Sequence, residues 1–414
     1  MLRSLSVRVM IALALGLALG ALAAAFGGHG VKLAIGLIEA VGSLWLNSLR
    51  MTVVPLIFAV LVTGIAGVAD AAATGRLAVR ALVLIAVLMT VSACFALGFA
   101  QVFYAIWPVA GPGVSALRAG AVAAPEVAKA APTFVGFVSG LAPGNVLKAA
   151  SEDAILPMVV FASFFGFAVT RLPETRRVAF TEIFQNLGDV MVMIVRWVLA
   201  AAPIGVFALA LGVGLRAGAG AAGVIAHYIT AIVLGNVGMM LVAYVVAMLG
   251  RVPIGAFARA VAPVQVTAFA TQSSLACLPA MIERCRDDLG VADRVSGLVL
   301  PLAVSIFRIT GPVANFGVAL FVAQVYGVHP TAMQYLGATL VAVATSMASV
   351  GLPGQVSFFA SIAPICLSMG LPVDLLPILI AVEVVPDIFR TLGNVTGDMA
   401  ITAVLARGEA ASAS

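Results

Sequence analysis

The sequence contains few charged residues. Of its 414 residues, 9% are Asp, Glu, Lys or Arg and 63% are hydrophobic, with a mean hydropathy of +1.18, whereas roughly a quarter of the residues of a soluble domain are charged. This composition excludes a water-soluble nucleic-acid binder, a secreted disulfide scaffold and an enzyme with a single membrane anchor. It predicts a multi-pass membrane protein, because one span takes about 20 apolar residues and the length allows about eight to twelve spans.

Cysteine and histidine are also scarce. The four cysteines have no metal-binding spacing and the three histidines are scattered singly, so we predict no disulfide framework, no metal site and no cofactor. No nucleophile, base and orienting residue occur together, and we therefore expect a protein that is not an enzyme. The residues concerned are Cys94, Cys277, Cys285, Cys366, His29, His227 and His329.

Long apolar stretches alternate with short polar segments along most of the chain. Arg3 and Arg8 precede the first stretch, which is long enough for a retained helix rather than a cleaved signal peptide. With the N-terminus in the cytoplasm, most basic residues fall on the inner side, which predicts a bacterial-type inner membrane protein with both termini cytoplasmic. Eight crossings are predicted, near residues 8–27, 34–68, 78–107, 154–170, 187–215, 222–249, 295–325 and 374–406.

Two further stretches, 256–292 and 335–372, are moderately apolar but rich in Ser, Thr, Gly and Pro at their centres. Irregular backbone at membrane depth survives only where protein or a water-filled cavity satisfies it, so we expect two re-entrant helical hairpins. Region 108–153, rich in Ala, Gly and Pro, is predicted to be an external linker that could include short helices. The fold class expected is an all-α membrane protein with eight spans and two hairpins.

The last span carries the densest polar cluster. Steps of three and four residues place its polar side chains on one stripe of a helix: Glu383, Asp387, Arg390, Thr391, Asn394 and Asp398. A charge at the bilayer centre costs about 2.5 to 3.5 kcal/mol, so several on one stripe indicate a ligand site or pathway. The alternative is a structural ion-pair network between helices.

The chemistry of this stripe suits an acidic amino acid. Arg390 can bind one carboxylate through two donors, and Asp387 can accept from an ammonium group. Asn394 offers an amide for a second carboxylate, and Thr391 a hydroxyl group. The hairpin centres would add backbone amides close to the ligand. The predicted substrate site is completed by Ser273, Ser274, Val350, Gly351, Gly354 and Gly311.

The chain resembles the dicarboxylate/amino acid:cation symporter family, which includes glutamate and aspartate transporters. The resemblance covers nearly the whole chain, including MTVVPLIFAVLVTGIAG at 51–67, APIGVFAL at 202–209, both hairpins and RTLGNVTGD at 390–398. It implies that the hairpin tips gate the substrate and that Arg390 receives the side-chain carboxylate. It also implies that Asp387 receives the amino group, that Asn394 binds the main-chain carboxylate and that Asp398 is a cation ligand.

The same resemblance implies a homotrimer that moves substrate by an elevator-like slide. A scaffold, residues 1–75 and 108–217, would hold a transport domain made of residues 76–107 and 218–414 with both hairpins. The implied partners are the lipid bilayer, a small acidic substrate and two further copies of the chain.

The seventh span departs from the family. Where the family has Asn-Met-Asp-Gly-Thr, this chain has Phe307-Arg308-Ile309-Thr310-Gly311. Sodium needs oxygen ligands, and two side chains that could supply them are now hydrocarbon. Val91, where many members have a hydroxyl group, points the same way. We therefore expect sodium-independent transport, driven by protons or running as exchange.

Arg308 is predicted to act as a tethered cation that faces Asp398 or Asp387 and replaces the charge of bound sodium. The alternatives are a helix-packing or snorkelling residue and a ligand for a second substrate carboxylate. Glu383 is the predicted proton carrier, because burial favours the neutral form of an acid.

The leading hypothesis is thus a secondary transporter of aspartate or glutamate. The alternatives are a dicarboxylate carrier that uses Arg308 and Arg390, an anion channel of the same fold, and a membrane receptor that binds the ligand without moving it.

Overall fold

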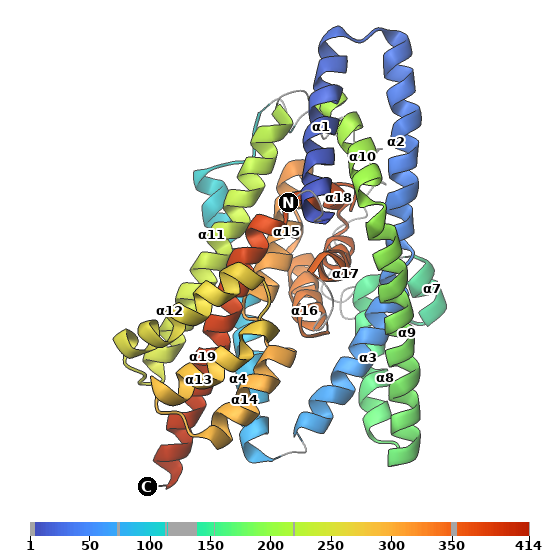
Figure 1. The fold of residues 1–414 in the computed structure, drawn as a ribbon. Coiled ribbons are helices and arrows are strands. Elements are labelled where there is room, and N and C mark those ends of the chain that lie inside the picture. The colour runs from blue at the N-terminus through green and yellow to red at the C-terminus, as the bar shows by residue number, and fades with distance from the viewer. Residues whose placement is uncertain are drawn as a thin grey trace.

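The computed structural model describes residues 5–72, 75–111, 114, 139–152, 154–217, 220–348 and 354–413, which form helices joined by turns and loops and contain no strand (Figure 1). The all-α prediction is confirmed there. The elements are α1 (Leu5–Phe26), α2 (His29–Arg50), α3 (Val53–Ala72), α4 (Arg76–Ile106), α7 (Val146–Ser151), α8 (Ile155–Thr170), α9 (Glu174–Ala200), α10 (Ala202–Ala217), α11 (Gly220–Leu249), α12 (Ile254–Thr271), a short 3₁₀ turn (Leu275–Cys277), α13 (Leu278–Asp287), α14 (Asp293–Ile306), α15 (Thr310–Tyr326), α16 (Ala332–Ala348), α17 (Gly354–Ser368), α18 (Leu376–Val382) and α19 (Val384–Ala413).

Seven helical segments of the described chain are long and apolar enough to cross a membrane. Five of them fall on predicted crossings that begin near residues 8, 34, 78, 222 and 295, and α9 overlaps the predicted stretch 187–215. The seventh is α12, which belongs to the first predicted hairpin. The stretches 154–170 and 374–406 form α8 and the pair α18–α19 and are not among the seven. The protein is thus a multi-pass membrane protein, while the count of eight crossings stays a prediction.

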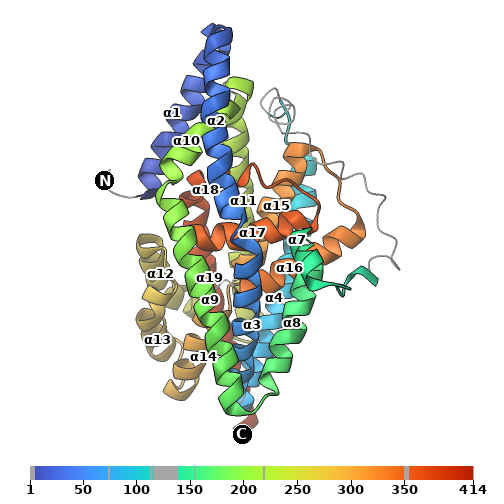
Figure 2. The same ribbon diagram turned by 90° about the vertical axis from the view of Figure 1, so that its right-hand side faces the viewer.

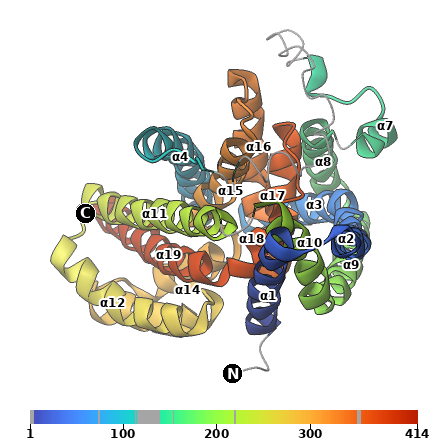
Figure 3. The same cartoon turned by 90° about the horizontal axis from the view of Figure 1, so that it is seen from above.

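The helices pack in two groups. In one group α1 packs on α10, α10 on α2, and α3 on α8 and α9. In the other, α19 packs on α11, α12 and α14, and α15 on α4 and α11. Helices α16 and α17 pack on each other and on α15, and both also contact α3 and α8 of the first group. Figures 1 and 3 show these two helices between the groups, and Figure 2 shows them beside α3 and α8.

Helices α1 and α10 approach so closely that their backbones touch. A Cβ atom added at Gly16 would lie 2.7 Å from the carbonyl oxygen of Phe207, and one added at Gly20 would overlap the carbonyl oxygen of Leu211. Glycine is therefore required at both positions for the observed packing, as in other closely packed membrane helices.

The two predicted hairpins appear as pairs of helices. The first runs from α12 through a turn, in which Gln272 has a positive φ of 52°, to α13. The second pairs α16 with α17, and its centre, residues 349–353, lies outside the described residues. Their entry into the membrane from one side remains a prediction.

Two of the helical segments in the second half of the chain are broken near proline. Helix α14 ends before Phe307, which is extended with φ −96° and ψ 121°, and α15 begins three residues later. Pro312, in the first turn of α15, has no backbone N–H, so it cannot donate to the carbonyl four residues earlier and link α15 to α14. Likewise, the ring of Pro386 conflicts with helical pairing at the carbonyl of Val382, where α18 ends. These breaks leave polar backbone and side chains in the interior.

Candidate functional site

Arg390 lies in a buried ion pair at the start of α19. Its Nη2 is 2.5 Å from Oε1 of Glu383, which occupies the break between α18 and α19, and both side chains are 7% exposed. The other carboxylate oxygen, Oε2, accepts a hydrogen bond of 2.7 Å from the hydroxyl of Tyr228 on α11. Tyr228 is completely buried. The carboxylate of Glu383 is therefore held between a cation and a phenol.

Asp387 lies on the more open side of the same guanidinium. Its Oδ1 is 3.6 Å from Nη1 of Arg390, and its side chain is 24% exposed. Arg390 Nε has no hydrogen-bond partner among the described residues. Thr391 donates its hydroxyl hydrogen to the carbonyl of Asp387, at 2.9 Å, and so bonds its own helix. The predicted grouping of Arg390 with Asp387 is present. The hydroxyl group of Thr391 bonds the backbone of its own helix and neither the guanidinium of Arg390 nor the carboxylate of Asp387.

Asn394, one turn further along α19, caps the start of α15. Its Oδ1 accepts from the backbone N–H of Thr310 at 3.1 Å and from the hydroxyl of Thr310 at 2.8 Å. The same hydroxyl oxygen lies 2.8 Å from the carbonyl of Arg390. The predicted ligands on α19 are thus tied directly to the broken seventh segment.

The second hairpin meets this region through Ser346, near the end of α16. Asn315 of α15 donates from Nδ2 to Oγ of Ser346 at 3.2 Å, and a Cβ added at Gly311 would lie 3.2 Å from Cβ of Ser346. Gly311 therefore permits a close approach of α16 to α15. Of the other predicted ligands here, Val350 and Gly351 lie outside the described residues, and Gly354 is the first residue of α17.

The first hairpin reaches α19 through its first arm. Gln265 of α12 donates to the hydroxyl of Thr396 at 2.9 Å. At the turn, Ser273 Oγ accepts from the N–H of Ala276 at 3.3 Å, and Ser274 precedes the 3₁₀ turn. Within the described ranges neither serine side chain hydrogen-bonds to α19, so their predicted role as substrate ligands remains a prediction.

Asp398 and Arg308 form the least satisfied part of the site. Asp398 is 0% exposed, and neither carboxylate oxygen has a hydrogen-bond partner in the described chain. Arg308, half-buried in the break before α15, makes no ion pair there but lies within electrostatic range of Asp398, Asp387 and Arg390. Both carboxylates named as its predicted partners are therefore nearby.

The residues that flank Arg308 are apolar and buried. Phe307 is 1% exposed and Ile309 is 0% exposed, and both side chains press on Gly397, where an added Cβ would lie 2.7 Å from Ile309 Cγ2. The space beside Gly397, the residue before Asp398, is thus filled with hydrocarbon, which offers no oxygen ligand to a hard cation.

Sequence reasoning missed the residues that support the charged stripe from other helices. Tyr228 and Gln265 hold Glu383 and Thr396, and Ser92 of α4 accepts from the N–H of Val313 at 3.1 Å. Some of these residues could have been suspected from the sequence, because a polar side chain within an apolar span usually has a polar partner on another helix. The partner itself could not be read from the sequence.

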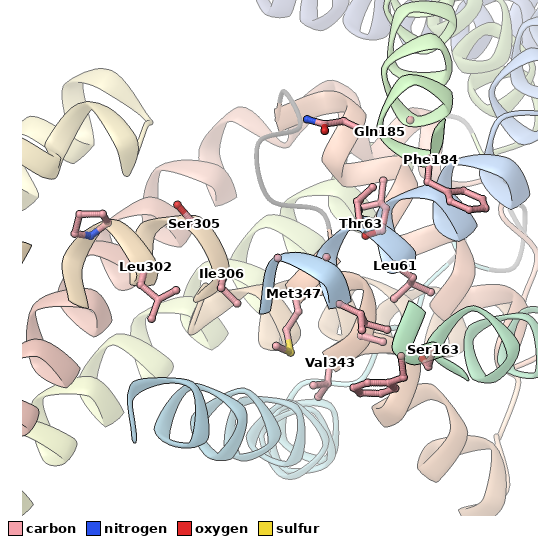
Figure 4. A pocket seen from close by; sticks show the side chains of 18 of the residues that line it. Leu61, Thr63, Ser163, Phe184, Gln185, Leu302, Ser305, Ile306, Val343 and Met347 are labelled. Carbon is pink, nitrogen blue, oxygen red and sulfur yellow. Dashed lines mark hydrogen bonds between the residues drawn. The ribbon is translucent and has the colours of Figure 1, made fainter. Parts of the chain in front are cut away.

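A large cavity in the described chain lies apart from this stripe. It has a volume of about 950 Å³ and is bounded by α3, α8 and α9 on one side and by α14 and α16 on the other. Figure 4 shows Leu61, Phe184 and Leu302 among its mostly apolar side chains. None of the residues predicted to bind substrate lines it, so it separates the two helix groups rather than forming the polar site.

Comparison with known proteins places the chain in a family. A profile of the sodium:dicarboxylate symporter family matches residues 5–408. The proton/glutamate-aspartate symporter of Escherichia coli (strain K12) is 27% identical over 413 residues, which cover 98% of this chain and 93% of that protein. The family membership read from the sequence is thereby confirmed, whereas the ligand roles, domain bounds and trimer that the resemblance implies stay predictions. The chain belongs to the sodium:dicarboxylate symporter family and is a transporter, not an enzyme.

Proposed function

We propose that the protein is a secondary transporter of aspartate or glutamate. The observation that carries the proposal is the grouping of Arg390, Asp387 and Asn394 on successive turns of α19. A carboxylate, an ammonium group and a second carboxylate are the complements of a guanidinium, a carboxylate and an amide. The name of the Escherichia coli relative, a glutamate-aspartate symporter, supports the same substrate class.

We propose further that a proton drives substrate binding through Glu383. This carboxylate occupies Nη2 of Arg390, which is one of the two donors that a substrate carboxylate would use. A proton on Glu383 removes its charge, weakens its hold on Arg390 and leaves the guanidinium to the substrate. Proton and substrate would then favour each other's binding, which is the reciprocity that symport requires.

Sodium has no comparable role in this proposal. Phe307 and Ile309 fill the space where the family has oxygen donors, and Arg308 adds a permanent positive charge near Asp398 and Asp387. An acidic amino acid brings a net charge of −1 into a site with several carboxylates, and Arg390 alone cannot balance it. Arg308 would supply the missing charge.

The packing supports the two-part arrangement that the family resemblance implies. We propose that residues 1–75 and 108–217 form a scaffold, that residues 76–107 and 218–414 form the transport domain, and that three copies assemble as a trimer. The strongest contacts of the described helices lie within these parts. The cavity between α3, α8, α9 and α14, α16 leaves part of the boundary loosely packed, as a sliding motion needs.

Uptake into proteoliposomes tests the proposal. Radiolabelled aspartate should accumulate when the outside is acidified, with choline in place of sodium on both sides, and unlabelled L-glutamate should compete. Saturation and stereoselectivity distinguish a carrier from an anion channel, and binding without uptake would indicate a receptor. Accumulation that requires a sodium gradient and ignores pH would contradict the proposed coupling.

Asp387 distinguishes an amino-acid carrier from a dicarboxylate carrier. Asp387→Asn should weaken aspartate binding, because the partner of the ammonium group loses its charge, while succinate binding, if any, should be spared. The loss of a charge-assisted contact typically costs about 2 to 5 kcal/mol. Calorimetry with both ligands checks this. Equal loss of both would contradict the assignment of Asp387 to the amino group.

A further inference from the structure

The start of α15 has a complete set of hydrogen-bond partners. The first four N–H groups of a helix have no partner within the helix. Here the N–H of Thr310 donates to Asn394, that of Gly311 donates to the carbonyl of Arg308 at 2.7 Å, Pro312 has none, and that of Val313 donates to Ser92. This helix end therefore offers no free donor to a substrate anion, and its first donor is used to hold a side chain of α19.

This bond fixes which way the amide of Asn394 points. An amide group can present either its oxygen or its NH₂ to a neighbour. The N–H of Thr310 can only donate, so it requires the oxygen of Asn394. The reversed amide would place two donors against each other and leave a buried N–H unsatisfied, which is costly. The Nδ2 group of Asn394 makes no hydrogen bond with the described residues and remains available to a ligand.

The side chain of Thr310 reinforces this orientation. It is 0% exposed, and its hydroxyl group lies 2.8 Å from Oδ1 of Asn394 and 2.8 Å from the carbonyl of Arg390, so that its one hydrogen can be donated to Oδ1. Its methyl group fills the space beside Gly393, where an added Cβ would overlap Cγ2 of Thr310. The residue is thus held by both its polar and its apolar atoms.

We propose that Thr310 is a positioning residue that makes Asn394 a pure donor toward the substrate and so selects a carboxylate over a carboxamide at that end of the ligand. The inference rests on the proposed function and goes beyond it. A carboxylate accepts with either oxygen and with a full charge. A carboxamide must turn its own carbonyl to Asn394 and leave its NH₂ group unpaired, because Asn394 cannot turn over to accept from it.

The test compares the Kd values of aspartate and of its α-amide in the full-length protein. Thr310→Val keeps the shape but removes the hydroxyl group, and Thr310→Ser is the matched control that keeps it. Thr310→Val keeps the backbone N–H that donates to Asn394 and removes only the bond from the hydroxyl group. The ratio of the two Kd values should therefore fall about fivefold, the effect of that one hydrogen bond, while Thr310→Ser should stay within about twofold of the unmodified protein. A purely structural role would weaken both ligands equally and leave the ratio unchanged, and that result would overturn the proposal.

A second measurement does not depend on the substrate. Asn394→Leu removes the acceptor from the N–H of Thr310, so hydrogen–deuterium exchange in a peptide that covers the start of α15 should become faster. Unchanged exchange would overturn the positioning contact itself. An unmodified protein that binds neither aspartate nor its amide, yet shows the faster exchange in Asn394→Leu, would contradict the proposed function and leave the contact between Thr310 and Asn394 confirmed.

Discussion

The two ends of the polar stripe on α19 differ in how their charges are satisfied. At the first end, Arg390 is paired with Glu383, and Glu383 also accepts from Tyr228. At the other end, both oxygens of Asp398 lack a hydrogen-bond partner and Arg308 makes no ion pair in the described chain. A buried charge without a partner is destabilising, whereas a paired one is tolerated.

This difference assigns different tasks to the two ends. A receptor for substrate needs a cation that can exchange one carboxylate for another, and the pair of Arg390 with Glu383 has that property. Asp398 has no hydrogen-bond partner among the described residues that a ligand could replace. We expect Asp398 and Arg308 to balance charge across a short distance without binding a ligand.

Removal of Arg390 should have the largest effect. Arg390→Ala should abolish binding of acidic substrates, because truncation of a buried charge-assisted partner costs about 2 to 5 kcal/mol and leaves Glu383 without its cation. Isothermal calorimetry with aspartate and glutamate is the measurement. Arg407→Ala, at an exposed position near the other end of α19, is the matched control. Unaltered affinity in Arg390→Ala would show that the substrate lies elsewhere.

Loss of the tethered cation should weaken binding less. Arg308→Met should lower aspartate affinity about tenfold in sodium-free buffer, about 1.4 kcal/mol, because the site then carries one positive charge fewer. Arg308→Lys, which keeps the charge, should retain most of the affinity. The idea fails if sodium raises the aspartate affinity of the unmodified protein tenfold or more.

Glu383→Gln should change pH dependence more than affinity. In the unmodified protein, aspartate affinity should fall as pH rises, because ionised Glu383 then competes for Arg390. A neutral glutamine cannot compete in this way, so the affinity of the variant should be nearly independent of pH. Exchange of aspartate between equal pools should continue, while uptake driven by a pH gradient should stop. If the variant still accumulates aspartate under a pH gradient, the transported proton is carried by a residue other than Glu383.

The smallest effect is expected at Tyr228. Tyr228→Phe removes one hydrogen bond to Glu383, and a bond to a charged group contributes about 1.5 to 3 kcal/mol. Because Arg390 remains, we expect a lower melting temperature and a shift of the pH dependence of aspartate binding, with maximal affinity retained. Tyr244→Phe on the same helix is a control, since its ring packs on Phe257 at 5.2 Å away from this pair. Equal shifts in both variants would indicate a general loss of packing.

Much of the stripe could be predicted from sequence, because its spacing follows the helix period and Glu383, Asp387 and Arg390 are close in the chain. The breaks at Phe307 and Glu383 were less predictable. Proline allows a break, but the tertiary contacts of Asn394 and Ser92 at the start of α15 decide where it falls. Tyr228 could not be assigned at all, since 155 positions separate it from Glu383 and only the packing of α11 on α19 brings them together.

The glycine contact between α1 and α10 also has a mechanical consequence. Two helices whose backbone atoms touch at Gly16 and Gly20 have no flexible side chains between them to adjust during a displacement, and a shift along the axis would drive Cβ atoms of neighbouring residues into carbonyl groups. They can only separate or remain in this register. Any large internal displacement must therefore leave α1 and α10 fixed to each other, and the boundary with the mostly apolar cavity, where side chains can change rotamer, is the place where it costs least.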